Sequence, residues 1–341
     1  MIPDFNKAGL AKLNNILSSP KKIVITTHYK PDGDAIGSSL ALYNYLIKKK
    51  HKVKVVSPND YPGFLQWMKG NAKIVDFEKK KKTASKHLAE ADIIFCLDFN
   101  DAKRVEDMQQ VLLQSKAVKV MIDHHLEPKD FCDYTFSFPE SCATCELIYY
   151  FIEQSGDKKL IDKDIAACIY TGIMTDTGSF RFNSMTADTH RIIAALLDTG
   201  LNHSQIHESV FDTYSESRTR FLGYILKDKM QILPTYNTGL IAVTNTELEH
   251  YNNETGDTEG IVNYPLNIHG IRMAAFFVEK DGYVKISFRS KGEFSVKDLA
   301  QKYFNGGGHR NAAGGKSDLS LDETVEKFIS VLEEYKEALT K

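Results

Sequence analysis

Three apolar runs in the first half of the chain end in acidic or imidazole residues, and this pattern restricts the fold more than any other feature. Lys22–Thr27, Asp92–Leu97 and Val118–Ile122 are runs of the kind typical of buried strands. Helical segments lie between them, among them Ala35–Lys50, whose apolar positions recur near a 3.6-residue period. This alternation predicts an α/β fold, with a mostly parallel sheet flanked by helices.

Further segments continue the same alternation. Another short strand is predicted at Val53–Val56. The helices predicted in this half are Phe64–Lys69, Ala102–Gln114, Ala143–Gln154, Lys163–Thr175 and Ala187–Asp198. Thr186 is a typical N-cap for the last of these helices, and Gly200 is a typical stop.

After about Leu201 the pattern changes. Two connecting helices, Ser204–Phe211 and Ser217–Met230, follow each other without a strand between them. Beyond Pro234, strands are predicted at Gly239–Val243, Arg272–Val278 and Tyr283–Arg289, the last two joined by a hairpin turn at Asp281-Gly282. Capping boxes predict two more helix starts, at Ser295–Asp298 and Ser320–Glu323.

A chain of 341 residues is long enough for two domains. We expect a first domain over residues 1–200, a helical linker over 201–233, and a smaller C-terminal α+β domain with a mixed sheet over 234–341.

The charge balance argues against one class of function. The formal net charge is −2, whereas a protein that grips long nucleic acid through its phosphates is usually basic over a whole face. The sequence has no apolar core suited to a signal peptide and no run of about 20 apolar residues. The odd count of five cysteines does not suit a disulfide framework. We therefore expect a cytoplasmic protein that contacts neither a membrane nor long duplex nucleic acid.

The polar residues at the three strand ends are expected to meet. They are His28, Asp32 and Asp34 after the first strand, Asp98 after the second, and Asp123, His124 and His125 after the third. In an open α/β sheet, ligand sites lie beyond the carboxyl ends of the strands. The sequence therefore predicts one polar crevice at this edge of the sheet.

The residue types in this crevice indicate a metal site. Pro31 and Gly33 shape a tight turn that can aim Asp32 and Asp34 in different directions. Carboxylates with some imidazole suit Mn²⁺, Fe or Co better than Mg²⁺, and crowded carboxylates need cations to neutralise them. Alternatively, Asp32 and Asp34 are turn and N-cap residues and His28 is incidental. Three such strand ends together favour the metal site.

Other candidate residues have simpler interpretations. Asp176 ends a predicted helix and would cap it, unless the rest of the site recruits it. Cys142 and Cys145 form a lone CxxC pair, which favours packing at a helix start over zinc or redox chemistry. His203 and His207 share one face of a helix without the HExxH order, which favours a solvated face. The lysine run 79–82 is expected to be a solvated loop.

A glycine-rich stretch stands out in the second domain. Residues 305–315 (NGGGHRNAAGG) are expected to form a loop whose backbone N–H groups are open to a phosphate. A plain glycine-rich connector is an equal alternative, because the stretch has neither the Walker order nor the GxGxxG order. Arg289 ends a predicted strand and offers a planar fork suited to a phosphate or carboxylate.

Four segments resemble, in order, the motifs of DHH phosphoesterases. They are THYKPDGDAIGSSLAL, FCLDFND, MIDHHL and TGIMTDTGSFRF. The later segments SFRS and VKDLAQKYFNGGGHRNAAGG resemble the DHH-associated C-terminal domain. The resemblance spans nearly the whole chain and is nearest to the nano-RNase and adenosine-3′,5′-bisphosphate (pAp) phosphatase type.

The resemblance implies a site with two divalent metal ions, with manganese favoured and Mg²⁺, Co²⁺ or Fe²⁺ as alternatives. One ion would be held by His28, Asp32 and Asp98, and the other by Asp34, Asp98, His124 and Asp176, with Asp98 bridging. Asp123 would orient an imidazole, and His125 would face the substrate phosphate. Arg289, Gly307, Gly308 and His309 would bind the far end of the substrate across a cleft between the domains.

The implied activity is hydrolysis of short oligoribonucleotides to 5′-mononucleotides, and of pAp to AMP. A metal-activated water would attack phosphorus in line without a covalent intermediate, and activity should fall below about pH 6 as the imidazoles protonate. Partners would be short RNA or small nucleotide phosphates, and a homodimer is also possible. The alternatives are a linear or cyclic dinucleotide phosphodiesterase, a single-strand exonuclease, an inorganic pyrophosphatase and a non-catalytic nucleotide-binding regulator.

Overall fold

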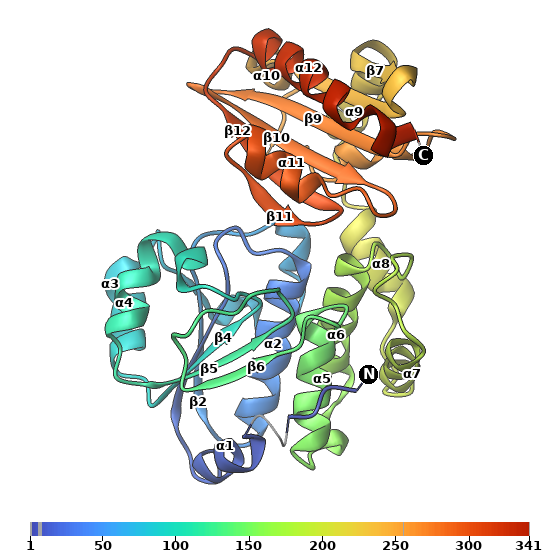
Figure 1. The fold of residues 1–341 in the computed structure, drawn as a ribbon. Helices are drawn as coiled ribbons and strands as arrows, with labels where there is room; N and C mark the ends of the chain where they lie inside the picture. The colour runs from blue at the N-terminus through green and yellow to red at the C-terminus, as the bar shows by residue number, and fades with distance from the viewer. Residues whose placement is uncertain (1, 6–8, 255, 341) are drawn as a thin grey trace. The chain divides into compact units, whose positions relative to one another are not determined.

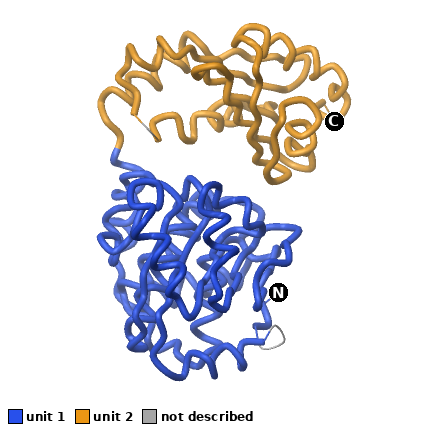
Figure 2. The backbone as a smooth tube through the Cα atoms, turned by 90° about the vertical axis from the view of Figure 1, so that its left-hand side faces the viewer, with its two compact units in different colours: residues 1–213 blue, residues 214–341 orange. Residues whose placement is uncertain are grey.

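The computed structural model describes residues 2–5, 9–254 and 256–340. The chain divides into two compact units, residues 1–213 and 214–341, which Figure 2 shows in different colours. Each unit has its own six-stranded sheet.

The sheet of the first unit is parallel throughout, with strand order β3-β2-β1-β4-β5-β6. Its strands are β1 (Lys22–Thr26), β2 (Lys52–Ser57), β3 (Ile74–Asp76), β4 (Ile93–Leu97), β5 (Val118–Asp123) and β6 (Tyr134–Ser137). The predicted parallel α/β fold is confirmed. The two edge strands, β3 and β6, were not predicted.

Helices cover both faces of this sheet. They are α1 (Leu10–Ile16), α2 (Gly33–Lys48), α3 (Lys81–Ala89), α4 (Gln109–Gln114), α5 (Thr144–Gln154), α6 (Lys163–Asp176), α7 (Ala187–Leu197) and α8 (His203–Phe211). Short 3-10 turns are formed by Gly63–Leu65, Asn71–Lys73, Ala102–Met108 and Lys158–Leu160. As predicted, the Thr186 side chain caps α7 by accepting from the Thr189 N–H.

The side chains of β1 show how the two faces are covered. Ile23 and Ile25 lie in one buried cluster with residues of α2, α5 and α6, whereas Val24 lies in another with residues of α3 and α4. Figure 1 shows α3 and α4 on one side of the sheet and α2, α5 and α6 on the other. Burial of both faces explains why the strands are almost continuously apolar.

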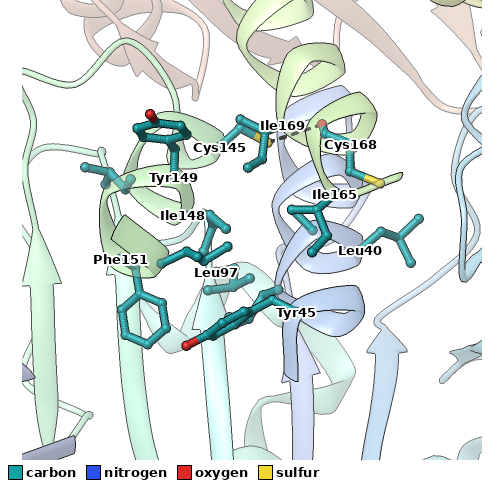
Figure 3. Packing of buried hydrophobic residues seen from close by; sticks show 14 of the residues in the cluster. Leu40, Tyr45, Leu97, Cys145, Ile148, Tyr149, Phe151, Ile165, Cys168 and Ile169 are labelled. Carbon is teal, nitrogen blue, oxygen red and sulfur yellow. Dashed lines mark hydrogen bonds between the residues drawn. The ribbon is translucent and has the colours of Figure 1, made fainter. Parts of the chain in front are cut away.

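Helices α2, α5 and α6 pack closely against one another on one face of the sheet (Figure 3). Cys145 of α5 lies between the other two helices, with its Sγ 3.8 Å from the carbonyl oxygen of Cys168. A Cβ atom on Gly172 would lie 2.1 Å from that Sγ, so only glycine fits there. Cys142 and Cys145 are both buried, and the cysteines of the described chain are free. The predicted packing role of the CxxC pair is confirmed.

The second unit has a mixed sheet with strand order β11-β12-β10-β9-β8-β7, in which β8 and β9 are parallel and the other pairs antiparallel. Its strands are β7 (Met230–Leu233), β8 (Thr238–Val243), β9 (Met273–Lys280), β10 (Tyr283–Ser290), β11 (Gly307–His309) and β12 (Ala312–Ser317). Its α-helices are α9 (Glu216–Tyr224), α10 (Asn245–His250), α11 (Val296–Tyr303) and α12 (Leu321–Thr340). Its shorter turns are Ile225–Lys229, Pro234–Tyr236, Ile261–Asn263 and Pro265–Asn267.

Aromatic side chains fill one face of this second sheet. Phe277 and Phe288 of neighbouring strands contact Phe328 of α12, with ring centroids 5.2 Å and 5.9 Å from it. The other face packs against α9 and α10 through a separate cluster that includes Phe221 and Phe276. The predicted α+β organisation with a mixed sheet is confirmed.

Several local predictions were wrong. The stretch 305–315 is not a loop, because most of it forms β11 and β12. The lysine run 79–82 is only partly a loop, since α3 begins at Lys81. The helix predicted over 217–230 ends at Tyr224 and continues as a π-helical turn before β7. Of the helix predicted over 64–69, only a 3-10 turn at Gly63–Leu65 forms.

No helix in the described part of the chain combines the length and apolar character that crossing a membrane requires.

Candidate metal centre

The turn after β1 fixes two carboxylates through the start of α2. Asp32 is the N-cap of α2, and its Oδ1 accepts from the backbone N–H groups of Asp34 and Ala35, each at 3.1 Å. Asp34 lies in the first helical turn and points into the protein, with a side chain that is 1% exposed. The capping role proposed as an alternative for Asp32 is therefore real, and the capping oxygen Oδ1 is also the one that lies near His28.

Asp98 follows β4 in an unusual backbone conformation. Its φ is +64°, in the left-handed region that costs a non-glycine residue free energy. Its N–H donates to the carbonyl of Ile122 in the neighbouring strand at 3.1 Å, which holds the strained residue in place. Such strain persists only where the surrounding structure imposes it, and here it turns the carboxylate into the crevice between the strand ends.

Asp98 stands between two imidazoles. Its Oδ2 lies 3.4 Å from Nε2 of His28, and its Oδ1 lies 3.5 Å from Nε2 of His124. Asp32 Oδ1 lies 3.9 Å from the same His28 nitrogen. Asp34 Oδ2 and Asp176 Oδ2 lie 3.9 Å and 3.5 Å from the His124 nitrogen. The structure therefore brings together His28, Asp32 and Asp98 on one side, and Asp34, His124 and Asp176 on the other.

This arrangement fits divalent cations. Within each of the groups His28/Asp32/Asp98, Asp34/His124/Asp176 and Asp98/His124/His125, the ligand atoms lie within 4.8 Å of one another. Carboxylate oxygens mixed with imidazole nitrogens are donors that Mn²⁺, Fe²⁺, Co²⁺ and Zn²⁺ accept. The two groups on either side of Asp98 could hold one ion each.

The ionisation of the cluster shows why cations would stabilise it. Burial, and then the charges of Asp98 and Asp176, raise the pKa of Asp34 well above its ordinary value. Burial, together with the charges of Asp32 and Asp98, raises the pKa of Asp176 to about 7 against the opposing effect of His124. Burial would lower the pKa of His124, but the surrounding carboxylates outweigh it and raise that pKa to about 9. Without cations the cluster retains protons, and divalent ions would replace them.

The start of α5 supports two of these carboxylates. The N–H groups of Thr144 and Cys145 donate to the two oxygens of Asp34, at 2.6 Å and 2.8 Å. The Thr144 hydroxyl donates to Oδ1 of Asp98 at 3.0 Å. The partial positive charge at a helix N-terminus favours the ionised carboxylates. One helix turn therefore fixes acidic groups that come from two different strand ends.

A buried glutamate connects the same helix to His124. The Ser141 carbonyl lies 3.2 Å from Nδ1 of His124, and the Ser141 hydroxyl donates to Glu146 at 2.5 Å. Glu146 also accepts from the Cys142 N–H at 3.1 Å and from the Thr189 hydroxyl at 2.7 Å. The carboxylate thus holds the loop whose carbonyl orients the His124 ring. Ser141, Thr144 and Glu146 were not predicted as site residues, and an acidic residue in the buried first turn of α5 is the signal that could have found them.

Asp123 contacts His125. The Asp123 carboxylate is fully buried, and its Oδ1 lies 2.7 Å from Nδ1 of His125. Its Oδ2 accepts from the His125 backbone N–H at 3.1 Å. This pair fixes the ring orientation of His125 through Nδ1, so Nε2 is the nitrogen that would meet a phosphate oxygen.

The remaining predicted residues lie in the second unit, and two of them, Arg289 and His309, lie in one row across its sheet. His309 of β11 is paired with Ala312 of β12, and Ala312 is paired with Arg289 of β10. Directly opposed residues share a face of an antiparallel sheet, so Arg289 and His309 flank the small side chain of Ala312. Gly307 also lies in β11, whereas a Cβ atom on Gly308 would lie 2.5 Å from the Ala312 carbonyl oxygen, which explains the glycine there by close packing.

His203 and His207 take no part in the cluster. His207 is half-buried and lies 3.1 Å from the Tyr170 hydroxyl through its Nε2, and its ring packs against Phe180 and Phe211. The prediction of a solvated face holds for the exposed His203 but is wrong for His207, which packs α8 onto α6.

Comparisons with known proteins agree with this geometry. Residues 22–173 match the family model described as the DHH family, N-terminal domain, and residues 238–338 match the DHHA1 domain. A bifunctional oligoribonuclease and PAP phosphatase from Thermus thermophilus is 30% identical over 322 residues, covering 94% of this chain and 90% of that protein. The crystal structure of an exopolyphosphatase-related protein from Bacteroides fragilis is 43% identical, with a TM-score of 0.96 and 98% of each chain covered. A cyclic-di-AMP phosphodiesterase from Listeria monocytogenes is 24% identical, covering 95% of this chain and 49% of that protein.

Proposed function

The chain belongs to the DHH family of metal-dependent phosphoesterases, and we propose that it hydrolyses short oligoribonucleotides to 5′-mononucleotides and adenosine-3′,5′-bisphosphate to AMP. The Thermus relative, which is named for both activities, aligns with nearly the whole chain. This family assignment makes the chain a hydrolase of phosphate esters, and the choice of substrate is the proposal.

The observation that carries the proposal is the position of Asp98 between the two imidazoles. Its oxygens lie 3.4 Å and 3.5 Å from Nε2 of His28 and His124, so one carboxylate can serve two ions. We assign one ion to His28, Asp32 and Asp98, and the other to Asp34, Asp98, His124 and Asp176. Two such ions, for which we propose manganese, would supply charge neutralisation at the phosphate and a nucleophile at neutral pH.

The chain's own residues would position the substrate. With Nδ1 held by Asp123, His125 offers Nε2 to a phosphate oxygen, where a hydrogen bond would stabilise the charge that develops during attack. Thr144 and Glu146 hold Asp34, Asp98 and His124 in place, so the ligands need little rearrangement when the substrate binds.

We propose that Arg289 and His309 bind the part of the substrate away from the scissile phosphate. Arg289 is half-buried with small alanines on both sides of its row, Ala312 in β12 and Ala274 in β9. Its Nη1 donates to the Phe288 carbonyl at 2.9 Å, which fixes the guanidinium, and we propose that its remaining N–H groups bind a phosphate or a base edge. Binding at such a compact site favours short substrates whose far end can be held.

The test is a comparison of substrates under one set of conditions. Hydrolysis would be followed for a 5′-labelled RNA dinucleotide, a pentanucleotide, a 24-mer, pAp, a linear and a cyclic diadenylate, pyrophosphate and polyphosphate. Each would be assayed with Mn²⁺, with EDTA, and with Asp98→Ala protein. We expect metal-dependent cleavage that weakens with RNA length, removal of the 3′-phosphate of pAp, and no activity in Asp98→Ala.

Other outcomes would point elsewhere. Preference for the 24-mer would indicate an exonuclease, and preference for a diadenylate would indicate a role like that in the name of the Listeria relative. Preference for pyrophosphate or polyphosphate would replace the nucleotide proposal. If no substrate were turned over but nucleotides still bound, the chain would be a binding protein.

A further inference from the structure

An exposed aromatic side chain follows the candidate ligand Asp176. Helix α6 ends at Asp176, and the next turn contains Gly178, Ser179 and Phe180 with φ values of +57°, +58° and +65°. The N–H groups of Arg181 and Phe182 both donate to the Thr177 carbonyl, at 2.9 Å and 3.1 Å. The turn therefore folds the chain back onto the end of the helix, and it leaves the side chain of Phe182 54% exposed.

The ring of Phe182 and the guanidinium of Arg181 are both held against Gly178. A Cβ atom on Gly178 would lie 2.6 Å from two atoms of the Phe182 ring, so the ring lies directly on this glycine. Nε of the exposed Arg181 donates to the Gly178 carbonyl at 2.8 Å. An aromatic ring and a cation are thus held against a glycine that lies two residues after Asp176.

The turn is anchored to the core of the first unit. The Phe180 ring packs against Tyr170 of α6, with centroids 5.4 Å apart, and against His207 of α8, with centroids 6.3 Å apart. Tyr170 and His207 are themselves hydrogen-bonded at 3.1 Å. Phe180 thus holds the turn, while Phe182 of the same turn faces water.

The metal cluster is exposed at this turn. The side chains of Asp32 and Asp176 are 61% and 32% exposed, whereas those of Asp34 and Asp98 are 1% and 3% exposed. A phosphate can reach the cluster only from the side where it is open to solvent, which includes Asp176. Arg181 and Phe182 follow Asp176 by five and six residues, in the segment that continues from this open side of the cluster.

We propose that Phe182 is the stacking platform for a nucleobase next to the reacting phosphate, and that Arg181 contacts a phosphate oxygen of the same nucleotide. This inference rests on the proposed function, because it names the part of a nucleotide substrate that the first unit recognises. Stacking on an aromatic ring tolerates any base, and the guanidinium fork suits a phosphate. The two side chains would make the enzyme prefer nucleotides over other phosphate esters.

The first test removes the ring and the base separately. Steady-state kinetics would compare wild type, Phe182→Ala and Phe182→Tyr on an RNA dinucleotide and on dinucleotides that lack one base. Loss of stacking should raise KM about tenfold in Phe182→Ala, and tyrosine should restore it. On the dinucleotide that lacks the stacked base, wild type and Phe182→Ala should have equal KM values, because removing the base and removing the ring abolish the same contact.

Trp67 supplies the matched control, since it is an aromatic residue of the first unit that is 40% exposed on another segment. Trp67→Ala should leave KM unchanged. An equal loss on both dinucleotides in Phe182→Ala would mean that the ring only supports Asp176, and weaker Mn²⁺ binding in calorimetry would show the same. Dissociation of a dimer on loss of the ring, seen by light scattering, would identify an interface and overturn the proposal.

A binding measurement separates this inference from the proposed function. Calorimetry would compare AMP with ribose 5-phosphate on the manganese-loaded protein, whether or not a dinucleotide is cleaved. Phe182→Ala should lower the affinity for AMP about tenfold and leave the affinity for ribose 5-phosphate unchanged. Arg181→Gln should lower the affinity for both ligands. Equal affinities of wild type and Phe182→Ala for AMP would refute the base platform. Failure of the wild type to cleave any nucleotide would instead refute the proposed function alone.

Discussion

The first unit buries ionisable side chains at one edge of its sheet, whereas most ion pairs of the second unit are exposed to water. Among the described residues, the buried charged side chains all belong to the first unit, and Asp34, Asp98 and Asp123 are among them. In the second unit, pairs such as Lys302–Glu334 and Arg310–Glu293 join side chains that are more than half exposed. Burying charges is costly unless they are paired or bind metal.

We propose that this difference places the metal chemistry in the first unit and part of the substrate recognition in the second. The buried carboxylates of the first unit repel one another unless bound cations neutralise them. We therefore expect its function to depend strongly on each buried group. The second unit is stabilised by its phenylalanine core, and the candidate binding residues Arg289 and His309 lie outside that core. Substitutions there should weaken binding without abolishing catalysis.

The largest effect is expected for Asp98→Asn. Asparagine tolerates the left-handed backbone at this position, so the fold should persist while the bridging charge is lost. We expect kcat/KM to fall at least about a thousandfold, measured with an RNA dinucleotide and Mn²⁺. The control is Asp157→Asn, which removes a carboxylate that contacts Lys49 and Tyr45 in the same unit. Comparable losses in both variants would show that the effect is not specific to the cluster.

A smaller loss is expected for Glu146→Gln. The carboxylate accepts three hydrogen bonds and holds the loop that orients His124, so the neutral amide should loosen one ligand without removing it. Mn²⁺ affinity measured by calorimetry should fall about ten- to a hundredfold. Glu153→Gln, on the same helix, should bind Mn²⁺ like wild type. Unchanged affinity in Glu146→Gln would confine the role of this glutamate to packing.

Arg289→Lys tests the second unit. A lysine keeps the charge but has no planar fork, so KM for the RNA dinucleotide should rise about tenfold while kcat stays near the wild-type value. Arg220→Lys, at an exposed ion pair in the same unit, should leave both constants unchanged. A loss in kcat of the size seen for Asp98→Asn would contradict the division of labour between the units.

The smallest effect is expected for Glu247, whose ion pair with Lys229 lies outside the metal cluster and is partly exposed. Burial alone would raise the pKa of Glu247, but hydrogen bonds from Lys229 and Tyr224 outweigh it and lower the pKa to about 2. Because the folded pKa lies below the unfolded value, this contribution to stability is present at neutral pH and is lost as the pH falls through about 4.5 toward 2. Urea unfolding should show Glu247→Gln destabilised by at most about 1 kcal/mol at pH 7 and by less at pH 3.

The neighbouring Glu249 of α10 provides the control, since it is exposed and its described side-chain hydrogen bond is with Asn245. Glu249→Gln should behave like wild type at both pH values. A larger loss at pH 3 than at pH 7 in Glu247→Gln would reverse the assigned direction of the pKa shift.

The sequence predicted those parts of the fold that local patterns determine. The central strands of the first sheet are β-branched runs buried on both faces, and the polar residues that follow them identify the cluster from the sequence alone. The edge strands β3 and β6 are three and four residues long and half-exposed, so they carry little periodic signal. Strand β12 (AAGGKS) has low strand propensity, and it forms because its small residues permit close pairing with β10 and β11.

The candidate site divides in the same way. Residues that directly follow a strand in the sequence could be predicted, because the carboxyl ends of parallel strands lie at one edge of the sheet. Glu146 and Thr144 could not, because their roles depend on contacts with residues far away in the chain, such as Thr189 and Asp98. The stacking role proposed for Phe182 likewise depends on a turn whose left-handed residues leave one ring packed and the next exposed.

The most direct test of the central claim is a titration of the metal-free protein with Mn²⁺, followed by calorimetry and by hydrolysis of an RNA dinucleotide in the same samples. The structure predicts that the wild type binds two equivalents of Mn²⁺ per chain and reaches full activity only after the second. In Asp98→Asn, we expect both the two-equivalent binding and the activity to be lost. A single equivalent, or hydrolysis that persists without metal, would contradict the claim that Asp98 joins two cations in a phosphoesterase site.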